Sequence, residues 1–165
     1  MSRNLFVALA AFVALTLSAA AIGSAFTTQS VLDWYATLRK PLGYPPPSYF
    51  GPVWTVLYCL MTLAAWNAWR IGDGWSGASA AITIYLIQLA LNAIWSAIFF
   101  GLRAPGLALA EIILLWTTIL ATVISFWRIS AVSGALLVPY LVWVTYATYL
   151  NTGIWHLNRT HSDSR

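Results

Sequence analysis

Charge is the scarcest property of this sequence, because only 7% of its 165 residues are Asp, Glu, Lys or Arg. A soluble domain carries about 25% charged residues, so this chain cannot supply the surface of an ordinary water-soluble enzyme. Its 61% hydrophobic content excludes a disordered chain, and its eight Lys and Arg residues form no basic stripe for nucleic acid. The single cysteine excludes an internal disulfide and a cysteine-based zinc site, and no His/Glu pairing suggests another metal. The class of protein that remains is an integral membrane protein.

Long apolar runs take the place of the missing charge. A bilayer core about 30 Å thick needs roughly 20 apolar residues per helix, and five runs meet this length without strand-like alternation. Short connections between the later runs make neighbouring helices antiparallel. We predict one all-α membrane domain over residues 1–165, a bundle of five transmembrane helices with spans at about 5–26, 50–69, 78–101, 105–127 and 131–157.

The first run has a second interpretation. Arg3 followed by an apolar stretch, with small residues near 19–25, also fits a cleaved signal peptide. However, the run is long for a signal peptide, and its small residues recur at helical spacing, as in Ala19 and Gly23. Such spacing allows close packing of helices in lipid and favours a retained span.

The connection at 27–49 is the one long loop between the predicted helices. Loops of this length in a compact chain are usually functional or disordered. Its prolines and aromatic residues favour a stiff, packed lid over a flexible tether. We take the residues of this lid to be Trp34, Pro41, Tyr44, Pro45 and Pro46.

The positive residues predict an orientation in the membrane. Five spans place the two ends of the chain on opposite sides, and the positive-inside rule assigns the more basic side to the cytoplasm. That side holds the long loop and the C-terminus, because it carries five basic residues against three: Arg39, Lys40, Arg103, Arg159 and Arg165 against Arg3, Arg70 and Arg128.

Polar side chains inside the third run mark a candidate site, because lipid offers them no water. Gln88, Asn92 and Ser96 recur every four residues and therefore share one helix face, with Trp95 and Phe99 beside it. Two interpretations are open, and they are compatible. These side chains either tie helices together or contact a ligand.

Glu111 is the one charged residue within the five runs. A carboxylate at mid-helix costs about 2.5–3.5 kcal/mol on insertion scales. Counted from the turn near Leu102, it lies level with residues 94–95. We expect Glu111 to face inward and to accept a hydrogen bond from Trp95 or Asn92, or to be protonated. The alternative is a helix-packing role without ligand contact.

Aromatic residues lie deeper than an interfacial belt explains. Tryptophans at span ends fit such a belt, whereas Trp95, Trp116 and Trp143 lie further inside. Trp54 and Tyr58 share a face of the second run. Aromatic faces combined with a few amides form a cavity suited to a flat, largely apolar ligand.

The third run also has a face of small residues: Ala93, Ala97 and Gly101. Small side chains let two helix backbones approach closely. This face serves a contact either within the bundle or between two copies of the chain, and we favour a homodimer.

The order of several short motifs resembles the TspO/MBR family, the tryptophan-rich sensory proteins of translocator protein or peripheral benzodiazepine receptor type. The likeness covers about residues 5–157. Its motifs are Trp34-Tyr35, Lys40-Pro41, Pro45-Pro46, Gly51-Pro52-Val53-Trp54, Leu57-Tyr58, Gln88-Leu89-Ala90-Leu91-Asn92, Trp95, Phe99-Phe100-Gly101, Pro139-Tyr140-Leu141, Trp143, Ala147-Thr148 and Leu150-Asn151.

The resemblance implies a five-helix bundle in which the first loop caps a pocket. It implies a receptor or carrier for tetrapyrroles (porphyrins and haem-related molecules) and similar hydrophobic small molecules, not an enzyme, with no required cofactor. Homodimers through the third helix are also implied. Carried over position by position, the ligand-binding residues are Phe50, Trp54, Tyr58, Asn92, Trp95, Phe99, Trp143, Ala147 and Leu150.

Two departures from the family pattern refine these expectations. Gly43 stands where the family loop commonly has a tryptophan linked to light-driven porphyrin breakdown, although Tyr44 is adjacent. Residues 152–156 lack the proposed cholesterol pattern of animal members, so we expect weak cholesterol recognition at most and a bacterial membrane. Photo-oxidative porphyrin degradation, or a sensor or scaffold acting through the tail 158–165, are the alternative functions.

Overall fold

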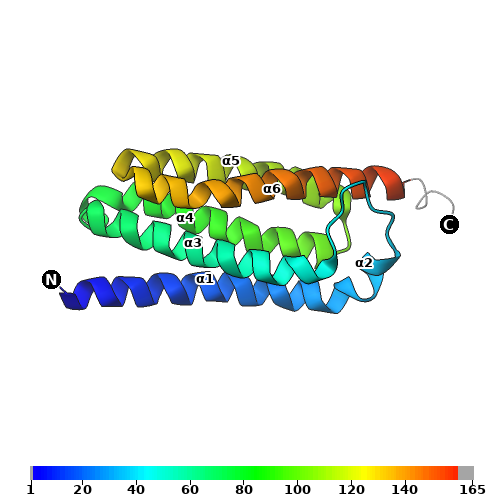
Figure 1. Cartoon of the computed structure of the whole chain (residues 1–165), viewed down its shortest axis with the longest axis horizontal. Helices are drawn as coiled ribbons and strands as arrows, with labels where there is room; N and C mark the ends of the chain where they lie inside the picture. The colour runs from blue at the N-terminus through cyan, green and yellow to red at the C-terminus, as the bar shows by residue number, and fades with distance from the viewer. Residues whose placement is uncertain (1, 160–165) are drawn as a thin grey trace.

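Five long helices form the body of the protein (Figure 1). The computed structural model describes residues 2–159, and it contains no strand in that part of the chain. The helices are long and apolar enough to cross a membrane, which confirms the predicted all-α fold with five spans. They are α1 (Ser2–Val31), α3 (Phe50–Ile71), α4 (Trp75–Ser96), α5 (Pro105–Ile129) and α6 (Ala131–Asn158).

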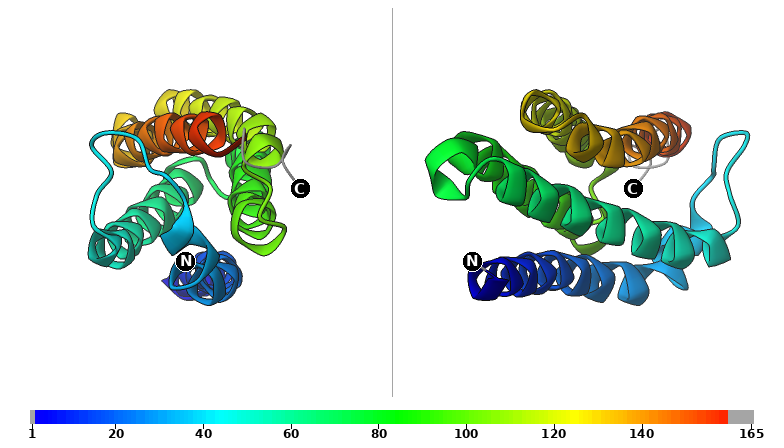
Figure 2. Two further views of the ribbon diagram at one scale, coloured as in Figure 1. Left: turned by 90° about the vertical axis from the view of Figure 1, so that its right-hand side faces the viewer. Right: turned by 60° about the vertical axis from the view of Figure 1, so that its left-hand side comes forward.

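The five helices form a ring when viewed along the bundle (Figure 2). α1 packs between α3 and α4, α5 packs between α4 and α6, and α6 returns beside α3. α1 begins at the end of the bundle opposite to the one where α6 ends (Figure 1). The ends of these helices therefore lie on opposite sides, as an odd number of spans requires.

The first helix is longer than predicted, and the lid loop is correspondingly shorter. α1 continues past residue 26 to Val31 because the hydroxyls of Thr27 and Thr28 donate to the carbonyls of Gly23 and Ser24, one turn back. These polar side chains are thus satisfied by their own helix. The short helices α2 (Trp34–Thr37) and η1 (Pro47–Tyr49) occupy more of the predicted loop, so its irregular part is 38–46.

A solid core fills the half of the bundle away from the lid. Tyr85 is fully buried, shares a 2.9 Å hydrogen bond with Thr16 of α1, and stacks on Phe126 of α5. Large buried side chains such as Met61 and Ile119 complete the packing. The other half, beneath the lid, holds the cavity described next.

Candidate ligand-binding cavity

A cavity of about 560 Å³ opens beneath the lid, between α1, α3, α6 and the end of α4. This volume lies within the range of small-molecule sites, about 300–1,000 Å³. Eight of the nine predicted ligand-binding residues line it, namely Phe50, Trp54, Tyr58, Trp95, Phe99, Trp143, Ala147 and Leu150. The structure therefore brings together aromatic residues from three helices that are far apart in sequence.

Asn92 is the predicted residue that the structure does not place in the cavity wall. It is 2% exposed, and its Oδ1 accepts a 3.0 Å hydrogen bond from the hydroxyl of Tyr58. Its Nδ2 donates to the hydroxyl of Tyr140, also at 3.0 Å. Asn92 thus ties α4 to α3 and α6 from behind the wall, which is the helix-linking interpretation of this amide.

The other two polar residues of that face differ from Asn92. Ser96 lines the cavity and donates to the carbonyl of Asn92. Gln88 is 1% exposed, and its amide has no hydrogen-bond partner among the described residues. The helix face predicted from their spacing is buried throughout. Of its three members, Asn92 links helices, Ser96 lines the cavity, and Gln88 has no hydrogen-bond partner among the described residues.

A wide helical turn shapes the aromatic wall at the end of α4. The π-helical turn η2 (Ala97–Gly101) follows α4 directly, and such turns occur frequently at functional sites. It brings the consecutive residues Phe99 and Phe100 to the cavity. Trp95 stacks on Phe99 with ring centroids 5.1 Å apart.

The hydrogen-bond donors of the wall divide into used and free groups. The Trp95 indole donates to Asn151, and the Thr27 and Thr55 hydroxyls donate to carbonyls of their own helices. The indole nitrogens of Trp54 and Trp143 have no acceptor among the described residues. The wall is therefore apolar, with two indole N–H groups available to acceptor atoms of a ligand.

The five predicted lid residues shape the lid without lining the cavity. Half-buried Trp34 packs edge-on against Phe99, and Tyr44 packs between Tyr35 and Phe50. Pro41 contacts α6, whereas Pro45 and Pro46 lead into η1. The residues of the lid that do line the cavity, Leu32, Tyr35 and Pro47, were not among the predicted lid residues.

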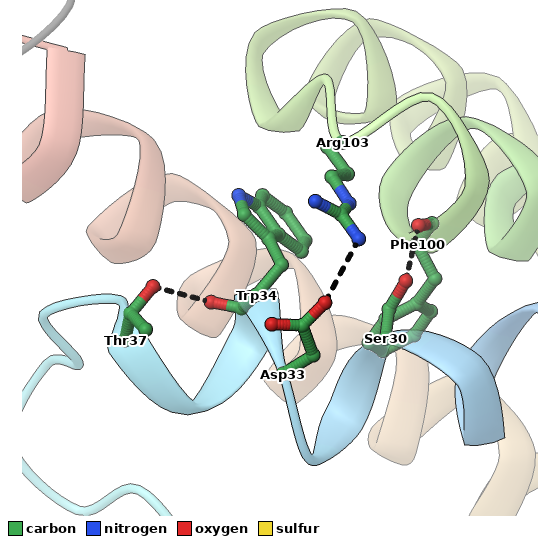
Figure 3. A network of polar contacts seen from close by, with 6 residues as sticks. All are labelled: Ser30, Asp33, Trp34, Thr37, Phe100 and Arg103. Carbon is green, nitrogen blue, oxygen red and sulfur yellow. Dashed lines mark hydrogen bonds and ion pairs between the residues drawn. The ribbon is translucent and has the colours of Figure 1, made fainter.

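Polar contacts join the start of the lid to the turn after α4 (Figure 3). Ser30 donates to the carbonyl of Phe100 at 2.7 Å, and Asp33 pairs with Arg103 at 3.3 Å. The Thr37 hydroxyl donates to the carbonyl of Trp34 within α2. The first two contacts hold the chain just before α2 against η2 and the turn that follows it.

The far side of the lid is fastened to α6. The Tyr146 and Tyr149 hydroxyls donate to the lid carbonyls of Gly43 and Leu42. Asn158 accepts from the backbone nitrogen of Arg39 and donates to its carbonyl, both at 3.0 Å. Sequence reasoning missed these contacts, although Tyr146, Tyr149 and the close-packed Gly153 recur on one helix face.

Lys40 binds the end of α2 and lies over two rings. Its ammonium donates to the carbonyls of Tyr35 and Leu38 at 2.9 and 3.1 Å, and it lies 5.0 Å from the centroid of the Tyr35 ring. Burial lowers the pKa of Lys40 and raises the pKa of Tyr35. Lys40 therefore stabilises the lid itself and is not directed to the cavity wall.

Known proteins are similar to this chain along most of its length. The model of the TspO/MBR family matches residues 12–156, most of the chain. The chain belongs to the TspO/MBR family. It is 42% identical over 152 residues to a protein named tryptophan-rich protein TspO from Chlorobaculum tepidum, covering 91% of this chain and 95% of that protein.

Two further relatives carry different names. The tryptophan-rich sensory protein of Cereibacter sphaeroides is 38% identical, over 88% of this chain and 92% of that protein. The human translocator protein is 38% identical, over 83% of this chain and 82% of that protein. Together with five apolar helices, membership of the TspO/MBR family makes the chain an integral, multi-pass membrane protein.

The expected hydrogen bond to Glu111 is absent from this TspO/MBR structure. Trp95 and Asn92 give their hydrogen bonds to Asn151 and Tyr140 instead. Both carboxyl oxygens of Glu111 are buried without a hydrogen-bond partner among the described residues. That part of the prediction is wrong because the two side chains found partners on α6.

The stripe of small residues is used, at one end, inside the bundle. A methyl group added at Gly101 would come within 2.9 Å of the Phe26 ring of α1, so Gly101 permits that close approach. Ala93 is buried within the single chain. The homodimer through Ala93, Ala97 and Gly101 stays a prediction.

Proposed function

We propose that this TspO/MBR protein is a membrane receptor or carrier that binds tetrapyrroles and similar flat, hydrophobic molecules in the cavity beneath the lid. The observation that carries the proposal is the wall itself. Aromatic faces from α3, α4 and α6 line a cavity of about 560 Å³, in which two indole N–H groups have no acceptor among the described residues. Ring contacts and apolar burial supply affinity in such a site, and a few polar groups set orientation.

The free indoles indicate which ligands fit best. A porphyrin offers a broad aromatic face and carboxylate acceptors, and we propose that the indole N–H groups of Trp54 and Trp143, two residues of the wall, donate to them. Cholesterol has neither a flat aromatic face nor a carboxylate, so we propose weak cholesterol binding at most. Two relatives are named tryptophan-rich sensory protein and translocator protein, and these names support a binding role.

A titration of the purified protein in detergent tests this proposal. Protoporphyrin, haem and cholesterol are compared by quenching of tryptophan fluorescence. We expect Trp143→Ala to weaken protoporphyrin binding by about tenfold or more, given the size of aromatic contacts. Trp75→Ala is the matched control, because Trp75 is 57% exposed and begins α4 at the opposite end of the bundle. Equal affinities in both variants would contradict the cavity as the site.

Illumination of the same complex separates binding from degradation. Gly43, with a φ of 79°, has no side chain. Nothing lies within 4 Å of the place where a side chain would begin, so no neighbouring ring takes this loop position either. We expect the porphyrin absorbance to persist under light. A light-dependent loss of absorbance would favour the photo-oxidative enzyme instead. The scaffold alternative depends on the tail 158–165, of which 160–165 lie outside the described residues.

A further inference from the structure

Asn151 of α6 touches two other helices with one buried amide. It is 1% exposed. Its Oδ1 accepts a 3.1 Å hydrogen bond from the Trp95 indole of α4, and its Nδ2 donates at 2.7 Å to the carbonyl of Pro105, where α5 begins. Both functional atoms of the amide are thus committed inside the protein.

The two contacts of Asn151 bracket an irregular segment. Between Trp95 and Pro105 lie the π-helical turn η2 and a three-residue connection. The backbone hydrogen bonds there span more residues than those of an α-helix. The nitrogen of Leu102 donates to the carbonyl of Ala97, and the nitrogen of Ala104 donates to the carbonyl of Ile98. A segment without regular helical pairing has more conformational freedom, so its geometry depends on restraints from outside.

This segment contributes aromatic residues to the cavity wall, which Asn151 also lines. Phe99 and Phe100 belong to η2, and both line the cavity. Phe99 stacks on Trp95, whose indole is the group that Asn151 holds. The middle of the segment has its own restraint, since Ser30 donates to the carbonyl of Phe100 (Figure 3).

We propose that Asn151 is a positioning residue that sets the orientation of the Trp95 indole and, through it, of Phe99. By restraining both ends of the segment 95–105, it keeps the stacked rings of Trp95 and Phe99 in place. It also occupies the indole N–H of Trp95, so Trp95 presents a ring face to the ligand, and hydrogen bonding falls to other groups of the wall, such as the indoles of Trp54 and Trp143. The consequence for affinity rests on the proposed function, whereas the consequence for Trp95 does not.

A double-mutant cycle tests whether Asn151 acts through Trp95. We expect Asn151→Ala to weaken protoporphyrin binding by about tenfold, the upper range for one hydrogen bond. In a Trp95→Phe background the same substitution should change affinity by less than about twofold, because the indole N–H is gone. An undiminished effect in that background would overturn the proposal.

Asn67→Ala is the matched control. Asn67 is also a buried amide whose two functional atoms have side-chain partners, namely Ser130, Ser133 and Arg70, but it lies near the end of α3 away from the cavity. Its loss should lower stability without changing affinity. If Asn67→Ala weakens binding as much as Asn151→Ala, general destabilisation explains both, and positioning is overturned.

Fluorine NMR of fluorotryptophan-labelled protein gives a readout without ligand. The Trp95 signal is assigned by its disappearance in Trp95→Phe. We expect it to move in Asn151→Ala and to stay in place in Asn67→Ala. If Asn151→Ala does not fold, Asn151→Leu, which has nearly the same volume but offers no acceptor to the Trp95 indole, replaces it. An unmoved Trp95 signal overturns the proposal, whereas a moved signal in a protein that binds no porphyrin overturns only the proposed function.

Discussion

Single polar residues in this bundle are explained by where their hydrogen bonds go. Asn92 and Asn151 each satisfy both ends of the amide with groups on two other helices. Leaving such a group buried without a partner costs about 1–3 kcal/mol, so these amides stabilise one arrangement of the helices. Glu111 lacks this compensation, because its buried carboxyl has no partner among the described residues.

Replacing Glu111 by leucine should therefore stabilise the protein. We expect Glu111→Leu to raise the free energy of unfolding by about 2 kcal/mol, because it removes an unpartnered polar group from an apolar bundle. Thermal unfolding in detergent measures the change. Glu111→Gln is the control, since it keeps an unpartnered polar group and should gain less. A loss of stability in Glu111→Leu would show that the carboxyl has a partner that matters.

Tyr35 should make the lid sensitive to alkaline pH. Burial raises its pKa above the ordinary 10.0, so the folded protein holds this proton at pH values where the unfolded chain releases it. Stability from Tyr35 is present below pH 10 and declines as the pH rises above that value. We expect the melting temperature to fall more steeply above pH 10 in wild type than in Tyr35→Phe. Parallel curves would contradict this.

At the scale of elements, the lid is a short segment held at both sides. The rings of α2 pack on Phe99 and Phe100 of η2, and 38–46 is fastened to α6 by two tyrosine hydroxyls and Asn158. Gly153 allows this approach, because a methyl group there would lie 2.7 Å from a side-chain carbon of Pro41. The lid therefore depends on α6 as much as on its own prolines.

Loss of one fastening should loosen the lid. We expect Tyr149→Phe to speed amide hydrogen exchange in 38–46 by about fivefold, since one hydrogen bond contributes about 1 kcal/mol. Tyr49→Phe is the matched control, because the Tyr49 side chain is 59% exposed and its hydroxyl has no partner among the described residues. Equal exchange in both variants would show that the Tyr149 contact does not hold the lid.

The helices could be predicted from sequence, whereas their irregular parts could not. Hydrophobic length alone places five spans, because bilayer thickness sets it. The π-helical turn at Phe99 has no signature in composition, and the extension of α1 at Thr27 depends on hydroxyls bonding to their own helix. The lid contacts join residues about a hundred apart, such as Tyr149 and Leu42, which no local pattern reveals.

The cavity, like the fold, could be predicted from the sequence only in part. Helical spacing and the family resemblance select the aromatic wall, and eight of nine residues line it. Spacing assigns Asn92 to the right helix face, but it does not tell that Tyr58 stands in front of it. The choice of Trp95 and Asn92 as partners for Glu111 failed for a similar reason, since depth along a helix does not specify which neighbour takes a hydrogen bond.

The described part of the molecule divides into a solid half and a hollow half that holds the cavity beneath the lid. The hollow half lies at the end that carries more basic residues, which predicts a cytoplasmic lid. We expect Ala36→Cys, in a Cys59→Ala background, to react with an impermeant maleimide only after permeabilisation of cells. Ser76→Cys, in the first turn of α4, should react on intact cells. The opposite pattern would reverse the orientation.

The central claim is that a flat ligand occupies the hollow half, between α3, α4 and α6. The most direct measurement is an experimental structure of the purified protein saturated with protoporphyrin. The account predicts the ring within the cavity, against Trp95 and Phe99, with its acceptors near the indole nitrogens of Trp54 and Trp143. A porphyrin bound on the lipid-facing surface of the bundle, with the cavity unfilled at saturation, would contradict it.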